Sequence, residues 1–493
     1  MQIVLPELKA GQAQTAAMDL TSVDELTKAL TAGYGTDVSA LTGGGALRVQ
    51  SLEKTMLSTI QDNEHFRLFN RLAKPSAGAT VDEWTEQNSV GGFLGGSTNT
   101  ETGTIAAAQG SYARRVGQVK YLMTRREVSF VQTLQSAIAD SEAVEQSNGA
   151  LQLLSDAEYL SFEGDAGVVP TEFDGILAQL QAGVTAGLVS GDHILNADAA
   201  SLASINLINK SAATISGFGN FGKPTDIFLS QLTQSDFDNG LDPAFRVPLT
   251  DVPNGGITLG SPVVGIRTSW GNIANNSDVF VRDGDQMQPF EVDFPAVAAA
   301  NGFAPQSVTA DATNTDAASM FGASRAGNYY YLVCGVNAAG QSTGVQTSQV
   351  AVAAGKRVEL TITRSTAATE TGYVVYRTRL NGPHVVAGSV PGQGSDFRFM
   401  GRVACGGATT LYKDYNTDIP GTSKAYILNM LPSAMAITWR QLLPMLKFPL
   451  YPTNAAILPW AQLLFGYLRI GKRRHHVVIK NILPNGAVWR PFN

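Results

Sequence analysis

The sequence predicts an α+β chain whose mixed domain is interrupted by an all-β module. Three observations predict it. A Gly-, Ser- and Thr-rich stretch with strand-like alternation, 78–125, lies among segments whose apolar residues have helical spacing. Short strands separated by turn signals fill 303–423. Apolar segments resume at 424–493, so the all-β stretch is an insertion whose two ends must lie close together.

The composition indicates a surface that neighbouring molecules cover. Charged residues make up 15% of the 493 residues, against about 25% in soluble globular chains. The net charge of -6 provides no field that would attract nucleic acid, and two cysteines form neither a disulfide framework nor a zinc site. We find no targeting signal, and Pro459 and Gly466 interrupt the most apolar segment, which indicates buried core and no membrane span.

The N-terminal part predicts an arm followed by a helix. Residues 1–45 are rich in Thr, Ala and Gly and predict an extended arm. Residues 51–74 have apolar positions at helical spacing. The apolar stripe consists of Leu52, Met56, Leu57, Ile60, Phe66, Phe69 and Leu72.

The stretch 78–125 predicts a long two-stranded hairpin with a Gly-rich tip. An isolated hairpin is only marginally stable in water. Nothing nearby in the sequence supplies a surface for it, so we expect a partner subunit to provide one.

Three helices are expected after the hairpin. The first spans 127–142, the second 147–165, and the third lies near 196–210 with Asn196 as its N-cap. Their buried faces are expected to consist of Val131, Leu134 and Ile138; of Leu153, Ala157 and Leu160; and of Leu202, Ile205 and Ile208.

The stretch "SGFGNFGKPTDIFLS" raises the possibility of a nucleotide site. Gly217, Gly222 and Lys223 have the spacing of a phosphate-binding loop. Pro224 occupies the hydroxyl position, and proline has neither an N–H for the phosphate nor an oxygen for Mg²⁺. We therefore interpret the stretch as a Gly-rich turn that enters a strand.

Two further constellations are candidate metal sites. The basic run "GKRRHHVVIK" could also face DNA, but its His475 and His476 are adjacent and would point to opposite faces of a strand, so a solvated turn between two strands at a subunit contact is favoured. Asp283 and Asp285 in "RDGDQ" lack the remaining oxygen ligands of a calcium loop and predict a turn. No nucleophile elbow is present. We therefore expect no catalytic residue, no metal site and no cofactor, and hence no enzyme.

Within 303–423 the strands have distinct signatures. "YYYLVCGVNAAGQST" predicts two strands around a tight turn, "KRVELTITR" alternates, and "TGYVVYRTRLNG" alternates at Tyr373, Val375 and Arg377 before an Asn-Gly hairpin signal. The module resembles fibronectin type III and immunoglobulin-like sandwiches. Its expected core consists of Tyr331, Val333, Leu360, Ile362, Val374 and Tyr376.

The order of arm, Gly-rich hairpin, long helix ending "LSFEGD", "FDGILAQL", "GKPTDIFLS" and "VVGIRTSWGNI" resembles the major capsid proteins of tailed bacteriophages. The resemblance covers roughly 45–290 and 424–493. It implies these parts: an N-terminal arm, 1–77; an E-loop, 78–125; a P-domain with its spine helix, 126–215; the first part of an A-domain, 216–302; the inserted sandwich, 303–423; and a return of the A- and P-domains, 424–493.

The resemblance also implies function and partners. Copies of the chain would form hexameric and pentameric capsomers of an icosahedral shell around double-stranded DNA, assembled in the host cytoplasm and ending in the virion. A separate scaffolding protein, a portal and a cement protein are expected partners, without N-terminal cleavage. Some relatives cross-link through an E-loop lysine. Here residues 81–119 contain no lysine and the first one after them is Lys120, at the foot of the hairpin, so no cross-link is expected. The alternatives are an encapsulin-like compartment and a sugar-binding adhesin.

Overall fold

The computed structural model describes residues 65–134, 140–202, 205–240, 263–281, 296–297, 302–382, 396–452 and 455–492. Residues 51–64 of the helix expected over 51–74, together with Ile138, Asp283 and Asp285, lie outside these ranges. In the described remainder the only α-helix is the short α2 (Leu68–Arg71), so the helix was predicted too long there, although Phe66, Phe69 and Leu72 are buried as expected. The chain divides into two units, and the larger one is formed by 60–130 and 145–493.

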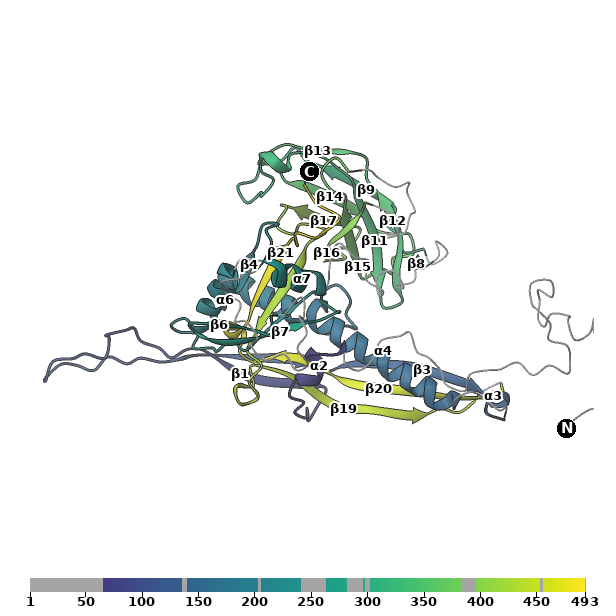
Figure 1. The fold of residues 1–493 in the computed structure, drawn as a ribbon, viewed down its shortest axis with the longest axis horizontal. Coiled ribbons are helices and arrows are strands. Elements are labelled where there is room, and N and C mark those ends of the chain that lie inside the picture. Colours follow the sequence, from purple (N-terminus) through teal and green to yellow (C-terminus); the bar gives the residue numbers. More distant parts are fainter. Residues whose placement is uncertain are drawn as a thin grey trace, which may run out of the picture. The chain divides into compact units, whose positions relative to one another are not determined.

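A long helix packs on a three-stranded antiparallel sheet (Figure 1). The side-chain amide of Gln462 donates to the Gln146 carbonyl over 2.6 Å, and Gly149 lies so close to Gln462 that a larger side chain would overlap it. The elements are α4 (Ser141–Glu163), β3 (Lys120–Ser129), β19 (Ile437–Pro449) and β20 (Ile457–Ile470). The predicted inward residues of this helix, Leu153, Ala157 and Leu160, are buried, which confirms that prediction.

A mixed six-stranded sheet has the order β4-β21-β18-β5-β7-β6. Its central strands are buried on both faces. One face packs on the layer that contains the long helix, and the other packs on helices that follow it. The strands are β4 (Ile194–Asn196), β5 (Asp226–Leu229), β6 (Gly265–Thr268), β7 (Gly271–Ser277), β18 (Ser423–Leu428) and β21 (Val477–Ile482). The helices after the long helix are α5 (Ile176–Thr185), α6 (Asn206–Ser216) and α7 (Gln231–Gly240). The chain leaves this sheet after β7 and returns to it with β18.

The predicted hairpin is present, with a shorter second strand than expected. Strand β1 (Val81–Ser89) pairs antiparallel with β2 (Ser111–Gln118), and residues 90–110 form the tip. The next strand, β3, belongs to the three-stranded sheet instead. The hairpin therefore ends at Gln118, short of residue 125.

The stretch between β8 (Ala296–Val297) and β17 (Thr409–Asp414) is all-β among its described residues except for one short 3-10 turn. One sheet has the order β16-β15-β11-β12-β8, a second β17-β14-β9, and a third pair is β10-β13. The remaining strands are β9 (Ser307–Asp311), β10 (Gly327–Tyr329), β11 (Tyr331–Asn337), β12 (Gly340–Gln346), β13 (Val350–Val352), β14 (Val358–Thr363), β15 (Gly372–Arg377) and β16 (Arg398–Ala404).

The two larger sheets share one apolar core, which we call the module core. It includes Tyr331 and Val333 of β11 and Leu360 and Ile362 of β14, as predicted. Val374 and Tyr376 are also buried, but on the opposite face of β15, against Val168 and Val169 from outside the module. The module therefore buries two faces, and the second requires the rest of the chain.

Strand β15 corrects the predicted alternation. All six of its residues are buried, including Arg377, because both faces of the five-stranded sheet are covered. Arg377 forms an ion pair with the buried Asp414, and its guanidinium lies 5.0 Å and 5.3 Å from the ring centroids of Tyr329 and Phe321. The partner strand begins at Arg398, so the Asn-Gly pair after β15 does not close a two-residue hairpin.

Two predicted helices were placed wrongly. Residues 127–129 continue strand β3, and the helix after it, α3 (Phe130–Leu134), leaves Val131 and Leu134 exposed. Asn196 ends strand β4, and its side chain accepts from the Asp198 N–H in a turn instead of capping a helix. Pairing with neighbouring strands decided both cases, and sequence periodicity does not report it.

Candidate assembly surface

The root of the hairpin is anchored through Asp82 on the rest of the folded chain, here called the body. Its carboxylate accepts hydrogen bonds from Arg440 Nε (2.9 Å), Arg440 Nη2 (3.1 Å) and Tyr467 Oη (2.6 Å), and Arg469 Nη1 lies 3.4 Å away. Burial acts to raise the pKa of Asp82, but the hydrogen bonds from Arg440 and Tyr467 outweigh it and lower that pKa. Opposite Asp82, Gly117 contacts the Tyr467 ring so closely that any side chain would overlap it.

A second set of ion pairs lies further along the same face of strand β1. Glu86 lies 3.2 Å from Arg115 of the paired strand and 4.0 Å from Arg473 of the body. The body thus supplies the surface that was expected only from a partner, because β19 and β20 lie far from the hairpin in sequence. This surface covers the root of the hairpin only.

The tip of the hairpin exposes large apolar side chains. Glycines with positive φ, Gly91 and Gly92, turn the chain there. The exposed fractions are 80% for Val90, 81% for Phe93, 76% for Leu94 and 87% for Ile105. Exposing four such side chains together is unfavourable unless another surface covers them.

The three-stranded sheet exposes a second apolar surface on the face away from α4, here called the open face. The pairing of Met123 with Leu463 and of Tyr121 with Phe465 places these side chains on that face. Strand β3 is also an edge strand, since its described residues pair only with β20. A ten-residue unpaired edge is a template for strand addition. Exposed or half-buried members of the open face are Tyr121, Met123, Leu443, Leu446, Phe448, Leu463 and Phe465.

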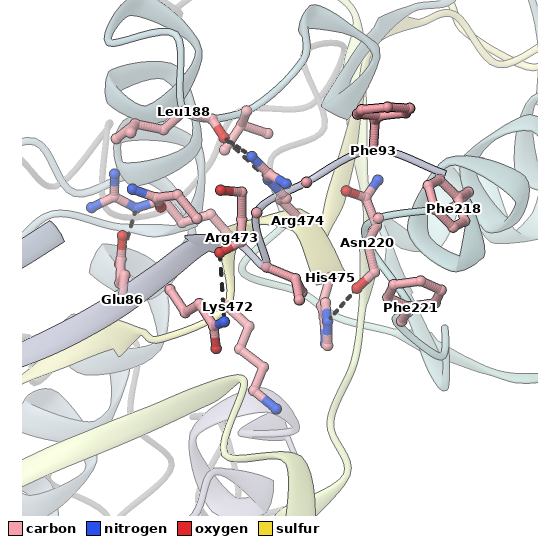
Figure 2. Close-up of a pocket in the computed structure, with 18 of the residues that line it drawn as sticks. Glu86, Phe93, Leu188, Phe218, Asn220, Phe221, Lys472, Arg473, Arg474 and His475 are labelled. Atoms are coloured by element: carbon pink, nitrogen blue, oxygen red, sulfur yellow. Dashed lines mark hydrogen bonds and ion pairs between the residues drawn. The ribbon is translucent and has the colours of Figure 1, made fainter. Parts of the chain in front are cut away.

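The hairpin, the Gly-rich loop and the basic turn meet at one pocket of about 920 Å³. In Figure 2, Phe93, Phe218 and Phe221 lie on one side of this pocket, while Glu86 and Arg473 lie on the other. Sequence reasoning singled out the loop and the turn separately. It gave no indication that they lie together, because 255 residues separate Asn220 from His475.

The Gly-rich loop directs its backbone N–H groups into the protein. The N–H groups of Asn220 and Phe221 donate to the Gly217 carbonyl, and that of Gly222 donates to the Ile215 carbonyl. The loop follows helix α6 and precedes strand β5, whereas a phosphate-binding loop follows a strand and precedes a helix. The interpretation as a turn entering a strand is confirmed, and Lys223 is exposed beside it.

The basic turn is more buried than expected. It links β20 to β21, as predicted, but His476 is fully buried and His475 is half-buried. His475 Nε2 donates to the Asn220 carbonyl (3.0 Å), and its Nδ1 lies 3.2 Å from the Asn429 side-chain amide. His193 donates from Nδ1 to the His476 carbonyl (2.8 Å). Each of these rings has a donor and an acceptor role, which suits neutral imidazole.

The neutral state of these histidines predicts acid sensitivity. Burial lowers the pKa of His193 and His475, and lowers that of His476 to about 3, against about 6.5 in an unfolded chain. The unfolded chain therefore binds protons that the folded chain cannot, and the free energy of unfolding falls as the pH decreases below about 6.5. Unfolding free energies measured across this range should show a shallower decrease for His476→Gln; equal slopes would contradict the prediction.

Removing the Asp82 carboxylate should destabilise the hairpin locally. Asp82→Ala leaves Arg440 and Arg469 without their carboxylate. The attachment of the hairpin should lose about 1.5–3 kcal/mol of stability for each charged hydrogen bond removed. Amides of β1 and β2 should then exchange roughly 10- to 100-fold faster. Glu83→Ala is the matched control, because its ion pair with Arg114 lies on the exposed face of the same strand and contributes at most about 1 kcal/mol. Equal exchange in both variants would contradict the anchor.

Other kinds of site find no support among the described residues. No group of metal-ligating side chains occurs there, and no helix there has the length and apolarity needed to span a bilayer. Cys334 is buried and Cys405 half-buried, and both are free thiols.

The chain matches no protein-family model and no curated protein. It is similar to several solved structures at low identity. For a capsid of a native GTA particle the identity is 9% and the TM-score 0.45, covering 91% of this chain and 100% of that one. For the capsid of Myoviridae phage XM1 the values are 8%, 0.41, 89% and 98%. For an encapsulin complex from Synechococcus elongatus they are 8%, 0.35, 88% and 93%.

Proposed function

We propose that this chain is the major capsid subunit of a tailed bacteriophage, and that its role is structural. The observation that carries the proposal is the hairpin: its root is fixed to its own body by Asp82, while its tip presents four exposed apolar side chains. This arrangement is suited to covering another copy. The open face of the three-stranded sheet adds a second apolar surface, and the low charge of the chain favours large contacts between copies.

The order of elements supports the same role. In a capsid subunit, β1 and β2 would serve as the E-loop. Helix α4 would be the spine helix, and it would form the P-domain together with the three-stranded sheet. The six-stranded sheet would be the A-domain. The part boundaries inferred from the sequence, with 303–423 as an insert, remain part of the proposal.

Strand order supports an immunoglobulin-like insert. The run β12-β11-β15-β16 has the sequence order of the C′, C, F and G strands, and β14 pairs with β9 in the other sheet as E does with B. Strand β17 comes after the G position yet pairs with β14, which departs from that pattern.

The proposed partners derive from the role. They are further copies in hexameric and pentameric capsomers, a scaffolding protein, a portal, a cement protein, and DNA bound without sequence preference on the inner face of the virion shell. We place the insert on the outer face, since packaged DNA crowds the interior.

Electron microscopy of the largest native assembly tests this function. Closed icosahedral shells packed with DNA are expected. Shells enclosing a protein cargo would favour the compartment, and a monomer that binds sugar would favour the adhesin; either result would overturn the capsid role.

A denaturing gel tests the expected absence of cross-links. Lys120 donates from Nζ to the Pro170 carbonyl over 2.5 Å, so the first lysine after the hairpin already has a partner on its own chain. Boiled, reduced shells should run as one band near 52.1 kDa. A ladder of multimers would show that covalent bonds join the subunits.

A further inference from the structure

Two buried carboxyl groups from distant parts of the chain meet beneath the segment 66–72. Glu158 of α4 is 0% exposed, and Asp278, which lies directly after β7, is 1% exposed. The Glu158 oxygens accept hydrogen bonds from the backbone N–H groups of Leu68 and Phe69, both over 2.6 Å. Asp278 Oδ1 accepts from the Phe280 N–H over 2.8 Å.

The remaining oxygen of Asp278 lacks a donor. Its Oδ2 is buried without a hydrogen-bond partner, although the Glu158 carboxyl faces it. Two ionised carboxylates in this position would repel each other, whereas a single proton between them supplies the missing hydrogen bond. Burial, and then the charge of Asp278, raise the pKa of Glu158; burial also raises that of Asp278.

Nearby cations do not remove this requirement. Lys74 faces Glu158 and lies 4.6 Å from the Phe69 ring centroid, and burial lowers its pKa. The charges of Arg67 and His65 act to lower the pKa of Asp278, but burial outweighs them. Arg71, of the same segment, is paired with Asp226 over 2.6 Å.

We propose that Glu158 and Asp278 share one proton and act as a pH-operated clamp on the segment 66–72. The clamp holds both partners of a stacked pair, Phe66 and Phe280, whose centroids are 5.5 Å apart. When the shared proton is lost, two adjacent negative charges remain and the segment detaches.

The direction of the pH effect is set by the raised pKa values. The stabilisation is complete below the unfolded pKa values of about 4 and is lost as the pH rises through the folded values. Between the unfolded and the folded pKa values, opening releases the shared proton, so the opening equilibrium should increase about tenfold per pH unit. Above the folded values it should level off, because the pair is then ionised in both states. The clamp therefore weakens in alkali, opposite to the histidine cluster, which weakens in acid.

Hydrogen exchange of the isolated subunit tests the clamp, whether or not the subunit forms shells. After correction for intrinsic rates, protection of the Leu68 and Phe69 amides should fall as the pH rises while the pair still holds its proton, and should level off once the pair is ionised. In Asp278→Asn the side-chain amide can donate to Glu158, so protection should stay constant. Glu163→Gln is the matched control on the same helix, because Lys424 already neutralises Glu163 at 2.6 Å; it should behave as the unmodified chain does.

Infrared spectroscopy gives a second measurement that does not depend on how a variant folds. At a pH above about 6, where Asp156 is ionised, the unmodified subunit should still show a protonated carboxyl band. Glu172, whose pKa burial also raises, is paired with Arg402 over 3.0 Å, and Glu172→Gln should therefore keep the band. Constant protection in the unmodified chain, an equal loss in Asp278→Asn, or absence of the band would each overturn the clamp.

Discussion

Replacing residues 90–110 by an Asn-Gly turn should leave a folded subunit that forms no closed shells. Strands β1 and β2 remain paired, since Ser89 faces Ser111 across the gap and a two-residue turn can join them. The root stays anchored at Asp82. What is lost is the burial of four large apolar side chains, worth about 6–12 kcal/mol per contact at about 1.5–3 kcal/mol each. A micromolar contact amounts to about 8 kcal/mol in total, so this loss decides assembly.

Point variants separate the apolar surface from the length of the tip. Phe93→Asp with Leu94→Asp should also prevent assembly. Ser97→Asp with Thr102→Asp adds the same charge at exposed polar positions of the tip and should assemble normally. Electron microscopy and light scattering report assembly, and hydrogen exchange of β3 and β20 reports folding. Shells of normal size from the Asn-Gly variant would refute the role of the tip.

Arg377→Met should destabilise the all-β module by about 3–5 kcal/mol, because the Asp414 carboxylate is left buried without its cation. Arg377 Nη2 also donates to Asn416 Oδ1 over 2.6 Å, and the Tyr331 hydroxyl donates to the same Asp414. The module contains no tryptophan, so exchange of the β11 and β15 amides is the suitable measurement. It should accelerate by roughly 100-fold or more.

Two comparisons make this result specific. Arg357→Met removes a solvent-screened surface pair with Asp316 and should leave the exchange of the β11 and β15 amides nearly unchanged. Arg377→Met combined with Asp414→Leu removes both buried charges and should recover much of the loss, because an apolar pair can replace a buried ion pair. Equal destabilisation by the single Arg377 and Arg357 variants would contradict the argument.

The sequence alone determined those elements whose signals are local. Alternation, turn residues and an intervening Gly-rich stretch predicted the hairpin; helical spacing placed Leu153, Ala157 and Leu160 on the buried face of α4; and the missing N–H of Pro224 argued against a nucleotide loop. These signals lie within a few residues of what they describe, so periodicity and backbone chemistry suffice to detect them.

Only the tertiary structure decided how these elements meet. Strand pairing turned 127–129 into part of β3, and cover on both faces buried all of β15, Arg377 included. The Asp82 anchor and the contact of Glu158 with Asp278 join residues that are far apart in the chain. No periodicity links such residues, because their proximity arises only when sheets and helices pack. The sequence therefore determined the kinds of element in this chain, and packing decided which carboxylates receive cations and which must share a proton.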